Sequence, residues 1–304
     1  TSGTHLKVGI VTGGVSINAQ AQRLQKGTDL LVATPGRLID LMEQGAVRLD
    51  MTQFLVLDEA DQMLDMGFIH ALRKIAPRLP ATRQTMLFSA TMPALMAELS
   101  TAYLKDPVRV EVSPPGKAAD KVTQALHYVE QNNKARLLVE HLSAHPGELA
   151  LVFTRTKHGA DRLQKALDRD GFEVGVIHGN KSQGQRQRAL DGFANGDLTV
   201  LVATDVAARG LDIPGVKHVY NFDMPNVPDN YVHRIGRTAR AGRDGRAVAY
   251  CSPAEMGELK AIHKTMGVEI PVHSGSPWSY AEQGEANKAK PKRGGRGGGG
   301  GGGK

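Results

Sequence analysis

The sequence contains a single cysteine, Cys251, among 304 residues. One thiol excludes an intrachain disulfide and suits a reducing cytoplasm, and its place in Ala-Val-Ala-Tyr-Cys favours a packed core thiol over a nucleophile. No apolar stretch approaches the roughly 18 residues that a membrane span requires. The first residues, Thr1 to His5, lack an initiator methionine and the pattern of a signal peptide. We therefore expect a cytoplasmic protein without a membrane partner, and a chain that is a fragment.

Charge is concentrated at one end of the chain. The net charge is +7, and residues 285–304 alone hold six basic residues against one acidic residue. From Lys288 to Lys304 the sequence is low-complexity Gly, Lys and Arg, which cannot bury a core. Residues 273–304 are therefore expected to form a disordered basic tail, and such a tail indicates a polyanionic partner.

Short apolar runs rich in Val and Leu alternate with amphipathic stretches such as 158–169 and 183–194. Strands that alternate with helices of this length predict right-handed βαβ units and an α/β fold with parallel sheets. The runs form two sets: Val8–Thr12, Leu30–Ala33, Phe54–Leu57 and Thr85–Phe88, then Leu149–Phe153, Val174–Ile177, Val200–Ala203, His218–Asn221 and Ala247–Cys251.

The break between the two sets falls at residues 113–119, Ser-Pro-Pro-Gly-Lys-Ala-Ala, which is preceded by a short expected strand. A small segment containing Pro and Gly is typical of an interdomain linker. We expect a first domain over 1–112, a linker over 113–120 and a second domain over 121–272 with a five- or six-stranded sheet. The first domain is small for a partner of the same type, so we interpret it as incomplete.

The run Phe54–Leu57 ends in three carboxylates, Asp58, Glu59 and Asp61. If this run is a buried parallel strand, the carboxylates emerge at its carboxyl end, where open α/β sheets bind ligands. A carboxylate there can hold Mg²⁺, and its neighbour can orient or deprotonate an attacking water. The pattern predicts the acidic half of a nucleotide-hydrolysing site.

The matching phosphate-binding loop, Gly-x-x-x-x-Gly-Lys-[Ser/Thr], is absent from the sequence. The segment 115–118 lacks the first Gly and ends in Ala, and the segment 179–182 lacks the Gly-Lys pair. The first domain is short by about the length that this loop, its strand and helix and one more βαβ unit would fill. We interpret the N-terminal part as removed or never captured.

Three polar segments of the first domain follow expected strands, and each has a plain structural alternative. Ser89 and Thr91 are placed to hydrogen-bond a carboxylate of the acidic cluster, but such residues also cap helices. The segment Thr34-Pro35-Gly36-Arg37 opens a helix whose free N–H groups suit a phosphate, although a plain strand-to-helix turn is the simpler interpretation. Gly13-Gly14 could admit a nucleic-acid backbone or simply form a turn.

The second domain offers two comparable segments. After the run that ends at Ala203, Thr204 is placed for a phosphate contact and Asp212 for a ribose hydroxyl, with Gly210 permitting a turn between them. The length of this polar insertion argues against an ordinary strand-to-helix loop. Gln183 and Arg186 begin a helix, which indicates a phosphate-backbone contact about as readily as a solvated helix start.

Three basic side chains, His233, Arg237 and Arg240, would share one face of a continuous helix. Such a face repels itself unless an anion fills it. We predict that the two arginines stabilise charge on a γ-phosphoryl group, with a solvated basic face as the alternative. His233 is expected to hydrogen-bond across a cleft rather than act as a base.

Together these segments resemble the DEAD-box family of ATP-dependent RNA helicases, whose name is spelled at residues 58–61. The resemblance covers roughly residues 5–270. The segments follow the order of the family's motifs: Gly13-Gly14, Thr34–Arg37, Asp58–Asp61, Ser89–Thr91, Leu151–Lys157, Gln183 with Arg186, Ala203–Asp212 and His233–Gly242. The segments 154–160 and 177–182 and the basic tail look most like the bacterial ribosomal-RNA-helicase-E (RhlE) subgroup.

The resemblance implies two RecA-like domains, the first incomplete here, that close over ATP, Mg²⁺ and RNA. It implies that Asp58 organises Mg²⁺ together with Glu59, which also activates the attacking water. The residues implied to complete the site are Asp61, Ser89, Thr91 and His233 at interdomain contacts, Gly210 and Asp212 at the ribose or the water, and Arg237 and Arg240 at the γ-phosphate. Those implied to hold the RNA backbone are Gly13, Gly14, Thr34, Pro35, Gly36, Arg37, Gln183, Arg186 and Thr204.

The sequence departs from the family pattern at its start. It lacks the adenine-reading glutamine motif, the phosphate-binding loop and the Pro-Thr-Arg-Glu-Leu-Ala segment, and Ala239 stands where many members have Gly. We expect the parent protein to be an RNA-stimulated ATPase that unwinds or remodels ribosomal or messenger RNA. The alternatives are a fragment that is only a non-catalytic RNA-binding module, and an ATPase acting on DNA or on protein–RNA complexes.

Overall fold

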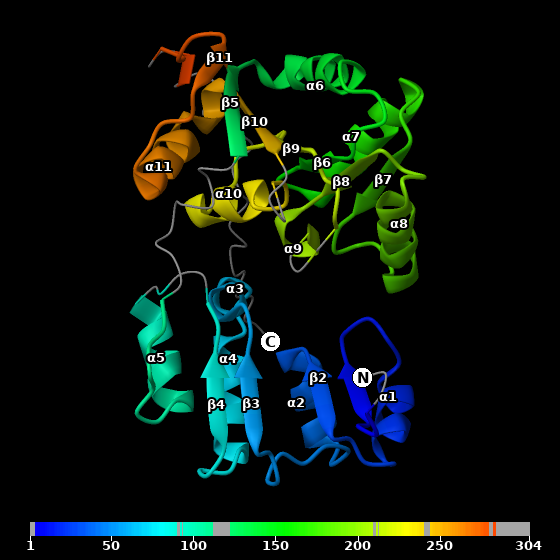
Figure 1. The fold of residues 1–304 in the computed structure, drawn as a ribbon, viewed down its shortest axis with the longest axis vertical. Helices are drawn as coiled ribbons and strands as arrows, with labels where there is room; N and C mark the ends of the chain where they lie inside the picture. The colour runs from blue at the N-terminus through cyan, green and yellow to red at the C-terminus, as the bar shows by residue number, and fades with distance from the viewer. Residues whose placement is uncertain are drawn as a thin grey trace, which may run out of the picture. The chain divides into compact units, whose positions relative to one another are not determined.

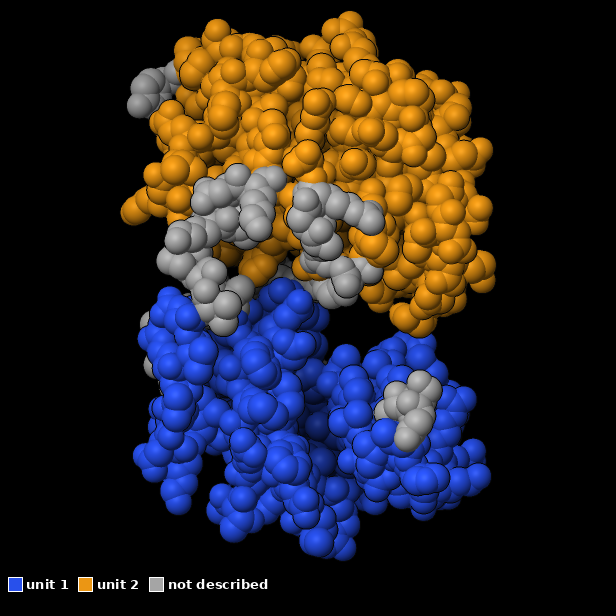
Figure 2. Space-filling view, in the orientation of Figure 1, with its two compact units in different colours: residues 1–115 blue, residues 116–304 orange. Residues whose placement is uncertain are grey.

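The chain divides into two compact units, Thr1–Pro115 and Gly116–Lys304, which Figure 2 colours separately. The computed structural model describes residues 4–89, 92, 94–111, 122–208, 211, 213–239, 244–279 and 282–283. The expected linker and most of the basic tail lie outside these ranges, as do Thr91, Gly210, Asp212 and Arg240. Residues 107–111, the described part of the segment before the linker, carry no regular structure, so they do not form the short strand expected there.

The second unit is built on one parallel sheet of seven strands in the order β11-β5-β10-β9-β6-β8-β7 (Figure 1). The sheet has two strands more than the five apolar runs of this domain and exceeds the expected five or six. The two additional strands are β5 and β11. Polar residues interrupt the apolar ones in β5, and β11 is short and exposed, so neither has the continuous apolar sequence of a buried strand. The strands are β5 Val122–Tyr128, β6 Ala150–Phe153, β7 Val174–Ile177, β8 Val200–Ala203, β9 His218–Asn221, β10 Gly245–Cys251 and β11 Val272–Ser274.

Helices cover both faces of this sheet, as the two-residue period of the strands requires. Val152 and its even-numbered neighbours pack with the helices α6 and α7, whereas Leu151 and its odd-numbered neighbours pack with α8 and α9. Among the described residues no helix is long and apolar enough to cross a membrane. The helical segments are η3 Gln131–Asn133, α6 Lys134–Ser143, α7 Lys157–Arg169, α8 Gln183–Asn195, α9 Asp205–Ala208, α10 Pro228–Ile235, η5 Pro253–Glu255 and α11 Met256–Met266.

The first unit contains two separate parallel strand pairs, β1–β2 and β3–β4. Its core joins Leu57 on β3 to apolar side chains of the helices α4 and α5, such as Leu72 and Leu99. Its elements are β1 Val8–Val11, α1 Ile17–Leu24, β2 Leu30–Ala33, α2 Pro35–Glu43, β3 Phe54–Leu57, α3 Ala60–Asp65, α4 Ile69–Ile75, η1 Ala76–Arg78, β4 Gln84–Leu87 and α5 Ala94–Tyr103.

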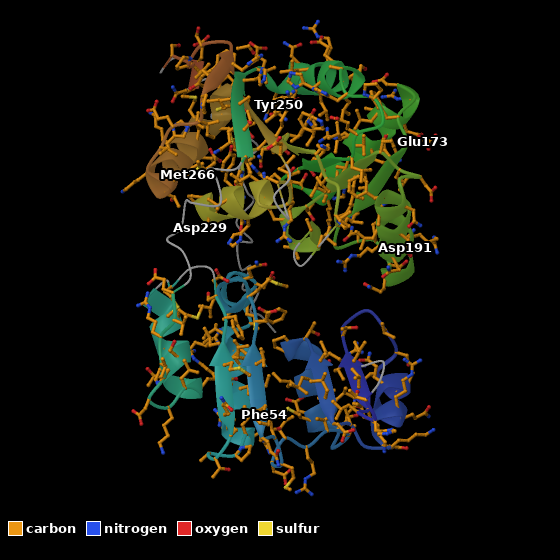
Figure 3. The ribbon with its side chains drawn as sticks, in the orientation of Figure 1. Phe54, Glu173, Asp191, Asp229, Tyr250 and Met266 are labelled. Carbon is orange, nitrogen blue, oxygen red and sulfur yellow. The ribbon has the colours of Figure 1, made fainter. Side chains whose placement is uncertain are left out.

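One face of these four strands is exposed. Phe54, labelled in Figure 3, is 64% exposed although it lies in a strand. Every strand contributes alternate apolar side chains to this exposed set, together with the residue after β4: Val8, Ile10, Leu30, Val32, Phe54, Val56, Met86 and Phe88. Parallel strands are ordinarily covered on both faces, so this exposed apolar face is unusual for strands of this kind.

A row of imidazole rings contributes to the packing of the second unit. His127 on β5 is 3% exposed, and its ring centroid lies 4.8 Å from that of His141 on α6 and 5.0 Å from that of His273 on β11. Its Nδ1 lies 2.7 Å from Ser274 Oγ. The pKa of His127 is lowered to about 4, mainly because the ring is buried and also because His141 and His273 lie beside it.

We expect the second unit to lose stability as the pH falls from about 6.5 to about 4. The unfolded chain protonates His127 near its ordinary pKa of 6.5 while the folded chain resists protonation until about 4, so acid favours the unfolded state in this window. Urea unfolding across this pH range should show a steeper fall for the natural chain than for His127→Gln. His158→Gln, at an exposed position on α7, is the control. Identical pH profiles for His127→Gln and the natural chain would contradict the expectation.

Candidate functional site

The three carboxylates of the acidic cluster lie at the carboxyl end of β3, as the sequence predicted. Glu59 immediately follows Asp58 and adopts the left-handed conformation (φ 51°, ψ 47°), an uncommon and strained one for a residue other than glycine. The turn is held to the neighbouring strand, because the Ala60 N–H donates to the Phe88 carbonyl (3.0 Å) and the Asp61 N–H donates to Ser89 Oγ (3.2 Å). The fold therefore brings Asp61 and Ser89 together across 28 residues.

The donor set of this turn suits a hard divalent cation. Asp58 is exposed, and one of its carboxylate oxygens, Oδ1, accepts from the Glu59 N–H (3.0 Å). Glu59 is half-buried beside it. Carboxylate oxygens that protrude at the end of a strand are the ligands that Mg²⁺ takes in proteins, usually with several waters retained.

The two glycine-containing segments of the first unit lie at the carboxyl ends of β1 and β2. A Cβ added at Gly13 or Gly14 would meet nothing within 4 Å, and Gly14 has φ +76°. The open space around this turn allows another backbone to approach closely. The turn is anchored by Gln20, whose amide exchanges two hydrogen bonds with the Thr12 backbone (2.9 and 3.0 Å). The sequence interpretation missed Gln20, since a glutamine in a short amphipathic helix carries no signal of its own.

Thr34 is the N-cap of α2 with Pro35 in the first turn, as predicted. The Thr34 side chain makes no capping hydrogen bond, so it does not satisfy the first N–H groups of the helix. The Arg37 guanidinium is 15% exposed, donates to the Val15 carbonyl (2.7 Å) and lies 3.5 Å from Asp40. Arg37 therefore links the segments that follow β1 and β2, and these two segments form one surface.

Gln183, Arg186 and Thr204 form a comparable surface on the second unit. Ser182 and Gln185 form a capping box that starts α8. From the first turn of this helix, Arg186 contacts the Gln183 side chain (3.4 Å) and the Ala207 carbonyl on α9 (3.5 Å). Thr204 follows β8, and its carbonyl accepts the first N–H bonds of α9.

The prediction that His233 and Arg237 share one helical face is wrong. The helix α10 ends at Ile235, and Gly236 is its C-cap, so Arg237 lies beyond the helix. Thr238 turns the chain back towards the sheet by donating to the Val216 carbonyl (2.6 Å). Arg237 instead donates to the Leu211 carbonyl (2.6 Å), which places it beside the loop that follows α9.

The residue that holds α10 in place is Arg234, which the sequence interpretation did not single out. Its side chain is 2% exposed, and its guanidinium forms a bidentate ion pair with Asp205 on α9 (2.5 and 2.8 Å). It also donates to the Asn221 side chain and the Asp223 carbonyl after β9, and it stacks on the Phe153 ring at 5.0 Å. Arg234 thus joins the carboxyl ends of three strands. Arg234 is identified only by its pairing with Asp205, which lies 29 residues away and is partly exposed, and the sequence does not show that pairing.

Polar loops at the carboxyl ends of parallel strands in two α/β units define a protein with two RecA-like domains. Residues 1–99 match the DEAD/DEAH box helicase model, and residues 133–242 match the helicase conserved C-terminal domain. The chain belongs to the DEAD-box helicase family. The RhlE-like subgroup stays a prediction, because the relative described below is named RhlB.

The chain is 45% identical to the ATP-dependent RNA helicase RhlB of Shewanella denitrificans over 88% of its own length and 63% of that protein's. The chain therefore spans less than two thirds of the length of this relative. A crystal structure of a DEAD box protein from the hyperthermophile Methanococcus jannaschii is 34% identical, with a TM-score of 0.50 and coverage of 89% of this chain and 73% of that one. The S. cerevisiae protein Dbp5 bound to RNA and ADP BeF3 is 28% identical, with a TM-score of 0.77 over 89% of this chain and 71% of that one.

Proposed function

We propose that the parent protein is an ATP-dependent RNA helicase, in which RNA-stimulated ATP hydrolysis drives local unwinding or remodelling of RNA duplexes. The observation that supports this most directly is the Asp58–Asp61 turn, where Glu59 is held in a strained backbone conformation beside Ser89, which follows β4. Strain of this kind is concentrated at functional sites. The family of the chain and an RNA-bound structural relative agree with the assignment.

In this proposal Asp58 and Glu59 hold Mg²⁺, which would neutralise charge on the phosphates, and Glu59 accepts the proton of the attacking water. Arg237 and Arg240 contact the γ-phosphate, and Gly210 and Asp212 lie at the ribose or the water. Asp61, Ser89, Thr91 and His233 couple the two domains. Arg234 acts as a positioning residue, because its pair with Asp205 fixes α10, which carries His233.

The RNA is gripped through its sugar-phosphate backbone by the two surfaces described above, which include Thr34, Arg37, Gln183, Arg186 and Thr204. Backbone contacts imply weak sequence preference and a marked dependence of binding on salt. The Gly/Lys/Arg tail adds non-specific tethering. We propose ribosomal or messenger RNA as the substrate. The single buried thiol supports a cytoplasmic location. The segments 154–160 and 177–182 support an RhlE-like subgroup.

A second candidate function applies to these 304 residues taken alone. Without the phosphate-binding loop, the fragment would be a non-catalytic RNA-binding module. The exposed apolar strand face of the first unit favours this view, because it is a surface that the rest of a complete first domain would cover. We propose that the loop belongs to that missing part.

We expect the 304-residue chain to show little RNA-stimulated ATP hydrolysis, because its sequence contains no Gly-x-x-x-x-Gly-Lys-[Ser/Thr] loop to bind the β- and γ-phosphates. The measurement is steady-state ATP turnover with and without RNA, beside a chain extended by the parent's phosphate-binding segment. Turnover by the 304-residue chain near that of a full-length relative would contradict the expectation.

Strand separation of RNA and DNA duplexes by the extended chain at one salt concentration tests the proposed substrate, and preference for DNA would overturn it.

A further inference from the structure

A tight turn joins α6 to β6 and carries two groups that can bind a metal ion. The Glu148 N–H donates to the His145 carbonyl (3.3 Å), with Pro146 and Gly147 between them and Gly147 at φ +77°. Pro followed by a residue with positive φ is the signature of a type II β-turn. The turn brings the His145 Nδ1 within 3.6 Å of the Glu148 carboxylate, and both side chains are partly exposed.

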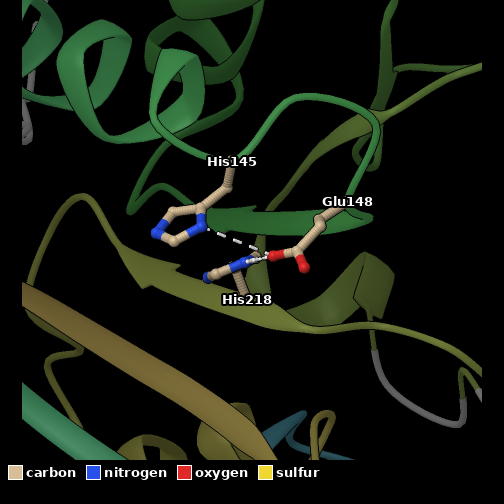
Figure 4. A group of neighbouring side chains, drawn as sticks. All are labelled: His145, Glu148 and His218. Atoms are coloured by element: carbon tan, nitrogen blue, oxygen red, sulfur yellow. Dashed lines mark hydrogen bonds and ion pairs between the residues drawn. The ribbon is translucent and has the colours of Figure 1, made fainter.

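A third group reaches the same place from β9. The His218 side chain is 4% exposed, and its Nε2 is hydrogen-bonded to Glu148 Oε2. The His218 N–H donates to the Leu149 carbonyl (3.2 Å), so its backbone is anchored to the same segment. Figure 4 shows both imidazole rings beside the Glu148 carboxylate. The centroids of the His145 and His218 rings lie 4.5 Å apart. The cluster lies at the amino ends of β6 and β9, the opposite end of these strands from the loops proposed to bind nucleotide and RNA.

The chemistry of this set suits a transition metal. Two imidazoles and one carboxylate are an established ligand set for zinc, with a water in the fourth position. The three ligand atoms, one from each residue, lie within 4.8 Å of one another. Zinc bonds of about 2.0–2.2 Å place tetrahedral ligands about 3.3–3.5 Å apart, so a small rotation of the half-buried His145 ring suffices.

We propose that His145, Glu148 and His218 bind a divalent transition-metal ion such as Zn²⁺. The exposed sides of His145 and Glu148 leave room for a water ligand. The bound ion ties the turn after α6 to the first residue of β9, and it therefore stabilises the second unit. This site is separate from the Mg²⁺ proposed at Asp58 and does not depend on the proposed ATPase activity.

One neighbouring group opposes the ion and offers a specific test. The Arg246 Nη1 lies 3.4 Å from the His145 Nε2, on the side of the ring away from Glu148. A metal bound at Nδ1 requires a proton on Nε2, which would then face the Arg246 donor. The cationic Arg246 and Lys217 also reduce the attraction of this place for a second cation. Replacing the exposed Arg246 with Gln should therefore strengthen metal binding.

The test is a calorimetric titration of Zn²⁺ into the untagged 304-residue chain after treatment with a chelator. We expect one stoichiometric site in the natural chain and a loss of affinity of about 100-fold or more in His145→Ala and Glu148→Gln, larger than the loss from an outer-shell partner. Co²⁺ should give a tetrahedral visible spectrum that both variants lose. These two variants are used because their side chains are partly exposed, and circular dichroism should show that they keep the natural fold.

His158→Ala is the matched control, since this exposed histidine lies outside the cluster, and it should bind Zn²⁺ like the natural chain. Arg246→Gln should bind more tightly. The proposal is overturned if the natural chain has no stoichiometric Zn²⁺ site, if the double variant His145→Ala/Glu148→Gln retains the natural affinity, or if Arg246→Gln binds more weakly.

Discussion

Replacement of Glu59 by Gln is expected to slow ATP hydrolysis by about 100- to 10,000-fold in a chain that carries the complete nucleotide site, the contribution of one positioned proton-transfer group. Gln has the size of Glu and keeps its capacity for hydrogen bonds, but it cannot take a proton from water. The left-handed backbone at residue 59 does not depend on the carboxylate, because hydrogen bonds from Ala60 and Asp61 hold the turn. Nucleotide and RNA affinity should therefore be retained.

Single-turnover hydrolysis measured beside equilibrium binding of nucleotide and RNA separates these effects. Glu43→Gln is a suitable control, because Glu43 is exposed at the end of α2 and makes only a loose ion pair with Lys74 (3.6 Å). It should hydrolyse ATP at the natural rate. Normal hydrolysis by Glu59→Gln would show that another group activates the water.

Replacement of Lys134 by Met is expected to destabilise the second unit by about 3–5 kcal/mol, the usual consequence of removing one partner from a buried ion pair. The Lys134 side chain is 0% exposed, and its Nζ donates to Glu255 Oε2 (2.5 Å) and to the Phe222 carbonyl (2.7 Å). Burial alone would raise the pKa of Glu255, but the Lys134 ammonium and hydrogen bonds from Ser252 hold it below its ordinary value. Without Lys134, a buried carboxylate loses its main counter-charge.

The free energy of unfolding from urea denaturation at neutral pH measures this loss. Arg136→Met on the same helix is the control, since Arg136 pairs with Glu140 at 3.7 Å on an exposed surface and should change the stability by only about 0.3–0.5 kcal/mol. The double variant Lys134→Met/Glu255→Gln should recover part of the loss, because Gln leaves no buried charge. Equal stability of Lys134→Met and Arg136→Met would show that Glu255 is adequately held by Arg155 and Ser252.

Much of the fold follows from the spacing of apolar runs. Phe54–Leu57, Val174–Ile177, Val200–Ala203 and His218–Asn221 are strands with the predicted bounds, because aliphatic or aromatic residues recur within each of these short runs and the sequence shows this directly. The strands β5 and β11, which lie side by side at one end of the sheet, were missed. Polar residues interrupt the apolar ones in β5 and β11 is exposed, so their strand identity comes from pairing with a neighbour distant in the sequence.

The sequence by itself determined the alternation of strands and helices, the two-part organisation and the acidic cluster at the end of β3, since these depend on neighbours along the chain. The tertiary structure alone decided where α10 ends, which partner Arg234 takes and which side chains accompany His218. Asp205 lies 29 residues before Arg234, and Glu148 lies 70 residues before His218. Such pairs form because strands that are adjacent in the sheet are distant in the sequence. The order of the strands in the sheet decides which residues meet, and no local sequence pattern predicts it.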